Sequence, residues 1–214
     1  MFGAINSEPR RSELDGVMLA HLSQGTRRLF YESGKRILDL IGASVVLLAL
    51  VLVGPVIALL IQSTSPGPVF FTQVRVGKNG RRFTMYKFRT MYRDAPHYEY
   101  SPGSGDDPRV TPVGRILRRA SLDELPQAFN VLLGHMSLVG PRPEMPFIVE
   151  KYTALELQRL AVKPGMTGLW QISPARVFPI HEHLEYDQYY LTNNPRFVWD
   201  ITLQLSGIRK FEAE

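Results

Sequence analysis

The chain has no cysteine among its 214 residues, and this absence limits what the protein can be. Disulfide bonds and thiolate metal sites are excluded. Internal repeats and low-complexity tracts are also lacking. Hydrophobic residues make up 44% of the chain and charged residues only 21%, which excludes a disordered protein. What remains is a chain long enough for one domain with a hydrophobic core.

Acidic residues are the minority of the charged positions, with 20 against 25 lysines and arginines, so the net charge is +5. The basic residues are grouped along the chain. This balance fits an anionic partner, which could be nucleic acid, a phosphorylated substrate or acidic lipid. No recognised nucleic-acid-binding motif supports the first of these, and a long apolar run argues against it. We therefore predict that nucleic acid is not a partner.

Residues 40–61 form this apolar run, which carries no charged side chain. A straight helix of that length would span roughly 33 Å, enough for the hydrocarbon core of a bilayer. Gly54-Pro55 lies inside the run, and a kink is expected there because Pro55 cannot donate to the carbonyl of Val51. Basic residues flank both ends, which favours two cytoplasmic ends. A re-entrant helix and a proline-kinked single span both remain open on this evidence.

Asp39 stands at the edge of the apolar run, one helical turn from Lys35 and Arg36. We predict ion pairs among these three residues at the level of the lipid headgroups. The residues before them are polar with scattered apolar positions, as in an interfacial amphipathic segment. The predicted organisation is an N-terminal polar or amphipathic segment (1–33), a membrane helix (34–62) and a compact cytoplasmic domain with interfacial helices (63–214).

A turn signal at residues 78–80, Lys-Asn-Gly, separates two runs of alternating apolar and polar residues. It predicts a β-hairpin with strands near 69–76 and 82–88. Lys87 and Arg89 are two residues apart and share a face of the second strand, as either a solvated basic face or a phosphate-facing pair. With the helical patterns elsewhere, the predicted fold class is helix-rich α+β.

Two adjacent carboxylates, Asp123 and Glu124, follow a run of arginines at the start of a helix predicted to end at Gly134. Ser121 and Glu124 match the S-x-x-E capping box, which is a purely structural interpretation. The alternative is that the acids take part in chemistry, and their spacing alone leaves both open. Arg142 lies in a Pro-Arg-Pro unit, whose stiff backbone suits recognition of phosphates or flat polar rings.

Taken together and in this order, these features resemble the bacterial sugar transferase family, the monotopic phosphoglycosyl transferases. No single stretch is specific, but their common order is. They run from about residue 34 to about residue 172, and the weaker YDQYYLTNNPRFVWDI extends the resemblance to about residue 201. Besides the proline-interrupted apolar run, the stretches that carry it are KRILDL, SPGPVFFTQVRVGKNGRRFTMYKFRTM, DPRVTPVGRILRRASLDELPQAFNVLLGHMSLVGPRPEMP and KPGMTGLWQ.

The resemblance implies a reaction in which a sugar-1-phosphate moves from a UDP-sugar to a polyprenyl phosphate, usually undecaprenyl phosphate, and UMP is released. This is the first membrane step of polysaccharide or glycan assembly. The resemblance also implies Mg²⁺ as cofactor, membrane lipid as a partner and a re-entrant helix. The catalytic domain would then lie on the cytoplasmic face of the bacterial inner membrane. The sugar, the pathway and the oligomeric state, a homodimer included, are left open.

Individual residues acquire roles from the same resemblance. Asp123 would be the nucleophile, forming a covalent phosphosugar intermediate, and a Mg²⁺ ligand, with Glu124 as its partner. Where many relatives have Ser-Pro in the membrane helix, this chain has Gly54-Pro55, and where relatives often carry Gly-Arg after LWQI, it has SPARVF. The basic residues expected to bind substrate or phosphate are Lys87, Arg89, Arg118 and Arg142, with Arg176 in place of the relatives' arginine.

A second hypothesis needs no chemistry. A non-catalytic, membrane-anchored basic protein that docks on acidic lipid or recruits other enzymes would explain the apolar run, the basic flanks and the capping box. It leaves unexplained why an acid pair, Lys87, Arg118 and a Pro-Arg-Pro unit occur in one chain. Loss of turnover in Asp123→Asn with membrane binding retained would distinguish the two hypotheses.

Overall fold

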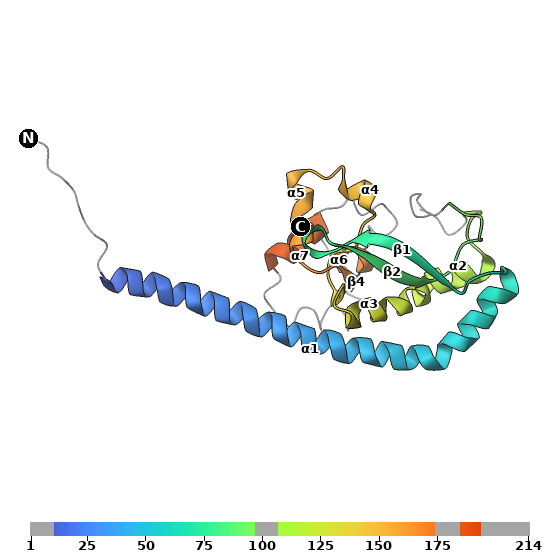
Figure 1. The fold of residues 1–214 in the computed structure, drawn as a ribbon, viewed down its shortest axis with the longest axis horizontal. Coiled ribbons are helices and arrows are strands. Elements are labelled where there is room, and N and C mark those ends of the chain that lie inside the picture. The colour runs from blue at the N-terminus through green and yellow to red at the C-terminus, as the bar shows by residue number, and fades with distance from the viewer. Residues whose placement is uncertain (1–10, 97–106, 174–184, 194–214) are drawn as a thin grey trace, which may run out of the picture.

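The computed structural model describes residues 11–96, 107–173 and 185–193, and within them the protein is helix-rich α+β with two small sheets (Figure 1). The predicted fold class is confirmed in this coarse form. The elements are α1 (Arg11–Thr64), β1 (Phe70–Val76), η1 (Lys78–Gly80), β2 (Arg82–Phe88), α2 (Pro112–Arg119), η2 (Leu122–Gln127), α3 (Ala128–Leu132), β3 (Ser137–Val139), α4 (Pro146–Val149), α5 (Ala154–Leu157), η3 (Gln158–Ala161), β4 (Gly165–Thr167), α6 (Leu169–Ile172) and α7 (Glu185–Asn193).

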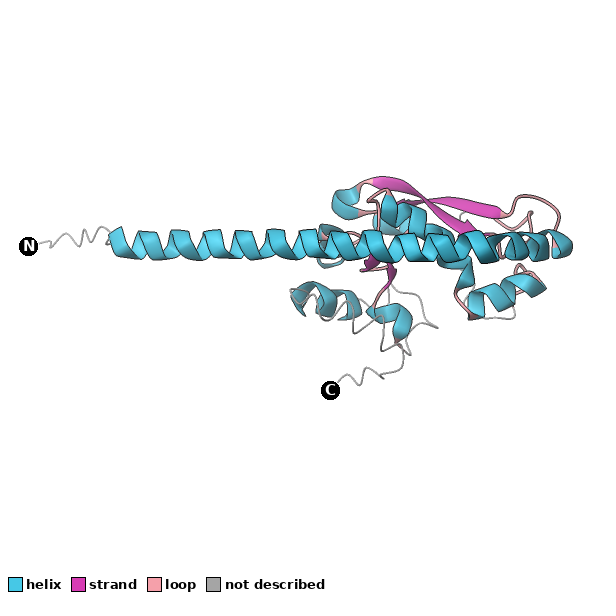
Figure 2. Cartoon of the chain, turned by 90° about the horizontal axis from the view of Figure 1, so that it is seen from below, coloured by secondary structure: helices cyan, strands magenta, loops and turns pink. Residues whose placement is uncertain are grey.

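Helix α1 is one continuous helix of 54 residues that runs along one side of the other elements and extends beyond them at its N-terminal end (Figures 1 and 2). It continues through Pro55, and its ribbon changes direction toward its C-terminal end in Figure 1. Apolar side chains such as Val51 and Leu52 are exposed on it. Residues 31–64 are long and apolar enough to cross a membrane, so the helix is compatible with membrane anchoring.

The opposite side of α1 packs against the rest of the protein. Ala43 joins Val131 of α3 and Met85 of β2 in one core cluster, and Leu50 joins Phe88 in a second. The contacts place η2 and α3 between α1 and the β1–β2 hairpin, as Figure 1 shows. The helix is thus part of the folded domain from Arg36 to Ile61, besides offering an apolar face to the outside.

The prediction that Asp39 pairs with Lys35 and Arg36 at the headgroups is wrong. Asp39 is buried, and its Oδ1 accepts hydrogen bonds from the Ser137 hydroxyl (2.9 Å) and the Leu138 backbone N–H (2.8 Å). Arg36 donates to the carbonyls at the end of α3. Asp39 and Arg36 therefore attach α1 to the domain. They bond to groups there that would otherwise be buried without a partner, and not to each other.

Replacing Asp39 by alanine is expected to lower the free energy of unfolding by about 1–3 kcal/mol, because a buried hydroxyl and a backbone N–H lose their acceptor. Thermal unfolding in detergent measures the effect. Ser44→Ala, at an exposed position of the same helix, is the control. Equal melting temperatures for the two variants would contradict the role of Asp39 in attaching α1.

The predicted hairpin is confirmed, with β1 starting one residue later than expected. The two strands pair antiparallel from Phe70 opposite Phe88 to Val76 opposite Arg82. Asn79 (φ 57°) and Gly80 (φ 74°) adopt the left-handed conformation in the turn, which these two residue types tolerate best. Since opposite residues share a face, Phe71, Gln73 and Arg75 lie on the same side of the hairpin as Lys87.

The helix predicted across the two carboxylates begins instead as the 3₁₀ turn η2 and becomes α-helical only in α3. Ser121 takes a left-handed conformation (φ 56°) and forms no side-chain cap, so the capping-box interpretation is wrong. Pro126 has no N–H to donate to the preceding turn, which disfavours a regular α-helix here. The acids are therefore not explained as helix-capping residues.

Candidate functional site

A cleft of about 350 Å³ opens between the β1–β2 hairpin, the segment that follows it, and α2 with η2. Asp123 is the one carboxylate among the described residues that line it. The lining residues are Pro68, Phe70, Phe71, Thr72, Gln73, Arg75, Met85, Lys87, Phe88, Arg89, Thr90, Met91, Tyr92, Arg93, Ala95, Pro96, Arg109, Arg118 and Asp123.

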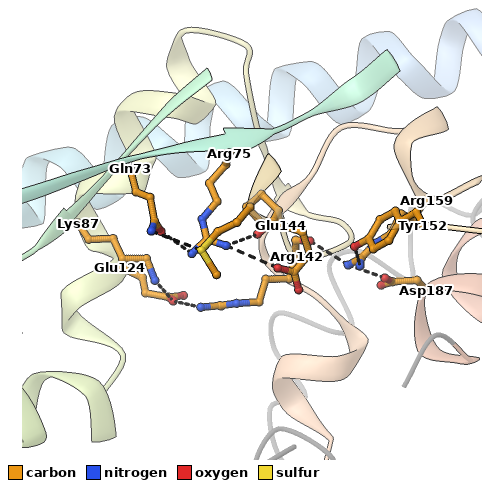
Figure 3. Close-up of polar contacts among 11 residues, drawn as sticks. Gln73, Arg75, Lys87, Glu124, Arg142, Glu144, Tyr152, Arg159 and Asp187 are labelled. Carbon is orange, nitrogen blue, oxygen red and sulfur yellow. Dashed lines mark hydrogen bonds and ion pairs between the residues drawn. The ribbon is translucent and has the colours of Figure 1, made fainter. Parts of the chain in front are cut away.

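The two adjacent acids lie in different surroundings. Successive residues of a 3₁₀ turn point about 120° apart, so Asp123 faces the cleft while Glu124 faces basic partners. Glu124 Oε1 accepts from Lys87 Nζ at 2.8 Å and from Arg142 Nη2 at 3.1 Å (Figure 3). A single carboxylate oxygen thus joins the hairpin to the Pro-Arg-Pro unit.

These surroundings shift the pKa values of the two carboxyl groups in opposite directions. Burial raises the pKa of Asp123 above its ordinary value, and the charge of Lys87 offsets this only in part. Burial acts on Glu124 in the same sense, but Arg142 and Lys87 outweigh it and hold the pKa of Glu124 well below its usual range. Glu124 is therefore a fixed anion, and Asp123 is a desolvated carboxylate that faces open space.

Asn130 of α3 holds strand β2 of the hairpin next to the two acids. Its side chain is fully buried, donates to the Thr84 carbonyl at 2.7 Å and accepts from the Tyr86 N–H at 3.1 Å. Both partners belong to β2, so the Asn130 amide forms hydrogen bonds that a neighbouring strand would otherwise form at this edge of the hairpin. Lys87, one residue further along β2, is positioned next to Glu124 as a consequence.

Replacing Asn130 by alanine is expected to lower the free energy of unfolding by about 2–3 kcal/mol, since two backbone groups of β2 lose their partners inside the protein. Equilibrium denaturation in detergent measures this. Asn130→Asp is the informative companion, because it keeps an acceptor for the Tyr86 N–H but cannot donate to Thr84. If both variants were as stable as the wild type, Asn130 would not hold β2 in place.

The Pro-Arg-Pro unit is held by its backbone. Three consecutive carbonyls each accept from a different donor: the Arg142 carbonyl from Arg159 (2.9 Å), the Pro143 carbonyl from Arg75 (3.3 Å) and the Glu144 carbonyl from the Val76 N–H (2.9 Å). Prolines on both sides of Arg142 restrict the backbone further. The Arg142 guanidinium lies 5.6 Å from the centre of the Trp170 ring, and is thus fixed between Trp170 and Glu124.

Behind this loop lies a network of buried charges that Figure 3 shows in full. Arg75 pairs with Glu144 (3.6 Å), and Arg159 pairs with Asp187 of α7 (2.8 Å). Gln73, Arg75, Trp170, Arg159 and Asp187 belong to the site but were not predicted from the sequence. Strand alternation could have placed Gln73 and Arg75 on the face of Lys87, but no sequence spacing indicates the pairing of Arg159 with Asp187.

The remaining predicted site residues have mixed outcomes. Arg118 lines the cleft, and its Nε donates to the Thr90 hydroxyl at 3.0 Å. Arg89 also lines the cleft, but it donates to the carbonyls of Ser65 and Pro66, which ties β2 to the end of α1. Lys87 and Arg142 lie together at Glu124. Arg176 lies outside the described residues.

Comparison with known proteins agrees with this picture. The sequence profile described as "Bacterial sugar transferase" matches residues 30–212. The chain is 41% identical to the "Galactosyl transferase CpsE" of Streptococcus agalactiae serotype III, over 94% of this chain and 47% of that protein. It is 38% identical to the "UDP-glucose:undecaprenyl-phosphate glucose-1-phosphate transferase" of Klebsiella pneumoniae, over 94% of this chain and 44% of that protein.

A shorter relative is covered more completely. The chain is 37% identical to the "Exopolysaccharide production protein ExoY" of Rhizobium meliloti, over 74% of this chain and 77% of that protein. The chain spans a little under half the length of the two longer relatives, at 47% and 44%.

Proposed function

The chain belongs to the bacterial sugar transferase family, and on that basis we propose that it moves a sugar-1-phosphate from a UDP-sugar to undecaprenyl phosphate and releases UMP. The product would start the assembly of a polysaccharide or glycan. The observation that supports this most directly is the pair of adjacent acids, one desolvated and facing the cleft, the other neutralised by two cations. The relative from Klebsiella pneumoniae is named for a reaction of this class.

The proposed reaction has two displacements at one phosphorus. In the first, a carboxylate oxygen of Asp123 attacks the phosphorus that bears the sugar. The bond from that phosphorus to the bridging oxygen breaks, and UMP leaves with the electron pair. In the second, a phosphate oxygen of undecaprenyl phosphate attacks the same phosphorus, and the bond to Asp123 breaks. The carboxylate is restored, so that one difficult displacement is divided into two easier ones.

The surroundings of Asp123 suit this role. A desolvated carboxylate is a better nucleophile than a hydrated one, because fewer water molecules must be removed before it attacks. Arg118 lies on the same cleft and would bind phosphate oxygens, and Arg142 and Lys87 add positive charge near the phosphorus. Glu124 keeps these two cations in place, and its role is positioning and charge balance.

Asp123 would also be the protein ligand of Mg²⁺. No group of three or more His, Asp or Glu side chains in the described part of the chain lies close enough to hold a metal ion. One carboxylate that faces a cleft still fits, since Mg²⁺ usually takes one or two carboxylates and completes its shell with water and substrate phosphates. Bound there, the ion would neutralise phosphate charge as the carboxylate approaches.

The membrane topology belongs to the same proposal. We place α1 as a re-entrant helix that bends near Gly54-Pro55 and keeps the catalytic domain on the cytoplasmic face of the inner membrane. The basic flanks of the apolar run and the change of direction toward its C-terminal end support this. The soluble cleft would then lie at the headgroups, where the phosphate of the lipid carrier resides.

The test is UMP release by the protein in nanodiscs, with Mg²⁺, undecaprenyl phosphate and a panel of UDP-sugars. We expect one sugar to give turnover that stops when Mg²⁺ is chelated. Without the lipid carrier, we expect a burst of about one UMP per protein and a matching gain of a sugar phosphate on the peptide that contains Asp123, detected by mass spectrometry. A folded protein that releases no UMP with any sugar would instead favour a membrane-anchored binding protein.

A further inference from the structure

The positive charge of the cleft is unevenly neutralised. Six basic side chains line its described part, and three of them are paired with a carboxylate: Arg75 with Glu144, Lys87 with Glu124, and Arg109 with Asp107. Arg118 lies near the opposite charge of Asp123, whereas Arg89 and Arg93 form no ion pair with any residue that the structure describes. The cleft therefore keeps a local excess of positive charge at these two arginines.

This excess lies beside the end of α1. Arg89 bonds to the carbonyls of Ser65 and Pro66, directly after the helix. A side chain at Gly67 would meet Arg89 Nη1 at 2.6 Å and Arg93 Cδ at 3.6 Å, so both arginines converge on this glycine. Pro68, four residues after the helix ends, lines the cleft, and four residues reach at most about 14 Å. One end of the cleft is thus close to the helix that we place in the membrane.

The same end carries exposed apolar surface. Phe70 is 52% exposed and Tyr92 is 40% exposed, and both line the cleft together with Pro96. Phe70 is held in this position by stacking on the buried Phe88, with ring centres 5.4 Å apart. A patch of arginine and aromatic side chains that adjoins a membrane helix is unusual for a site that binds only a water-soluble substrate.

We infer that this end of the cleft is the docking site of the lipid carrier, with its phosphate at Arg93 and Arg89 and the first isoprene units against Phe70 and Tyr92. The inference rests on the proposed function and adds a location to it. The uracil ring of a UDP-sugar could stack on an aromatic side chain, but a UDP-sugar has no apolar chain to extend along this surface toward the membrane helix. A monophosphate on an isoprenoid chain matches both halves of the patch. The two substrates would then approach Asp123 from different ends of the cleft.

Arg93→Gln tests the part of this site that binds the carrier phosphate. Arg93 is exposed and makes no hydrogen bond within the described residues, so the variant should fold. We expect the KM for undecaprenyl phosphate to rise about tenfold, as for loss of one charge-assisted hydrogen bond, and the KM for the UDP-sugar to change less than twofold. Arg81→Gln, at an exposed arginine of the hairpin turn, is the matched control. Equal carrier KM values for the two variants would overturn the inference.

Tyr92→Ser tests the apolar half, with Leu155→Ser, at another exposed apolar residue, as its control. We expect Tyr92→Ser to raise the KM for undecaprenyl phosphate severalfold, and also the KM for a short, soluble prenyl phosphate, because it carries the same first isoprene units. KM values for both carriers no higher than those of Leu155→Ser would exclude contact of Tyr92 with the chain.

Nanodiscs with and without phosphatidylglycerol separate the carrier from ordinary anionic lipid. An effect of Arg93→Gln that is confined to anionic nanodiscs would assign the arginine to headgroups and overturn the inference. UMP turnover by the wild type with carrier decides the proposed function independently. If no UDP-sugar gives turnover, the transferase proposal fails, and if turnover is present while all carrier KM values are unchanged, only the docking site fails.

Discussion

Asp123→Asn is expected to reduce UMP release by roughly 10³-fold or more while the protein remains at least as stable as the wild type. The loss of rate follows from removal of the nucleophile, because an amide cannot form the covalent intermediate. The stability follows from the electrostatics of the folded state. Burial raises the pKa of Asp123, so folding favours the neutral form of this side chain, and a neutral amide of the same shape avoids the cost of a buried charge.

The adjacent residue should behave in the opposite way. The pKa of Glu124 is depressed because Arg142 and Lys87 outweigh the effect of burial, so its charge stabilises the folded protein at neutral pH. Glu124→Gln leaves two partly buried cations without their counterion. We expect it to lower the free energy of unfolding by about 2–3 kcal/mol, and to lower activity because Lys87 and Arg142 lose their common anchor.

Thermal unfolding and UMP release, measured on both variants in the same nanodiscs, test the contrast. An Asp123→Asn protein as unstable as Glu124→Gln would show that both acids are structural. Residual UMP release from Asp123→Asn near the wild-type rate would exclude Asp123 as the nucleophile. If the two variants behaved alike in stability and in activity, Asp123 would not be the nucleophile beside a structural Glu124.

Local chemistry decided which features could be predicted from the sequence. The hairpin was predictable because Asn79 and Gly80 tolerate the left-handed turn that joins its strands. The acid pair was predictable as a feature of interest, since adjacent carboxylates after an arginine run are unusual. The capping box was not a safe guide, because the S-x-x-E spacing does not reveal that Ser121 turns left-handed or that Glu124 has stronger partners elsewhere.

Contacts between distant segments were not predictable. The error at Asp39 has this origin: its partners Ser137 and Leu138 lie 98 and 99 residues away, and no local pattern indicates them. Among the described residues, the same holds for Arg159, whose partner Asp187 lies on α7, and for Asn130, which bonds to β2. A single sequence contains these residues, but only the fold shows which of them meet.

Arg159→Gln is the second substitution with a large expected effect. Arg159 is buried and pairs with the buried Asp187, so its removal leaves a carboxylate without a counterion, at a cost of about 3–5 kcal/mol. The cost should depend on pH. Burial, against the opposing charge of Arg159, raises the pKa of Asp187 to about 6. Below that pH the carboxyl is mostly protonated and needs no counterion, so we expect a smaller loss at pH 5 than at pH 7.5.

The double variant Arg159→Gln/Asp187→Asn separates stability from positioning. It removes both charges, and we expect it to recover most of the stability at pH 7.5 and to lose the pH dependence. It does not restore the donor that Arg159 provides to the Arg142 carbonyl. The Pro-Arg-Pro loop should therefore stay loosened, and turnover should stay reduced in a protein that is stable again. Full recovery of turnover would show that Arg159 acts only through Asp187, whereas reduced turnover at restored stability would identify it as the residue that positions Arg142.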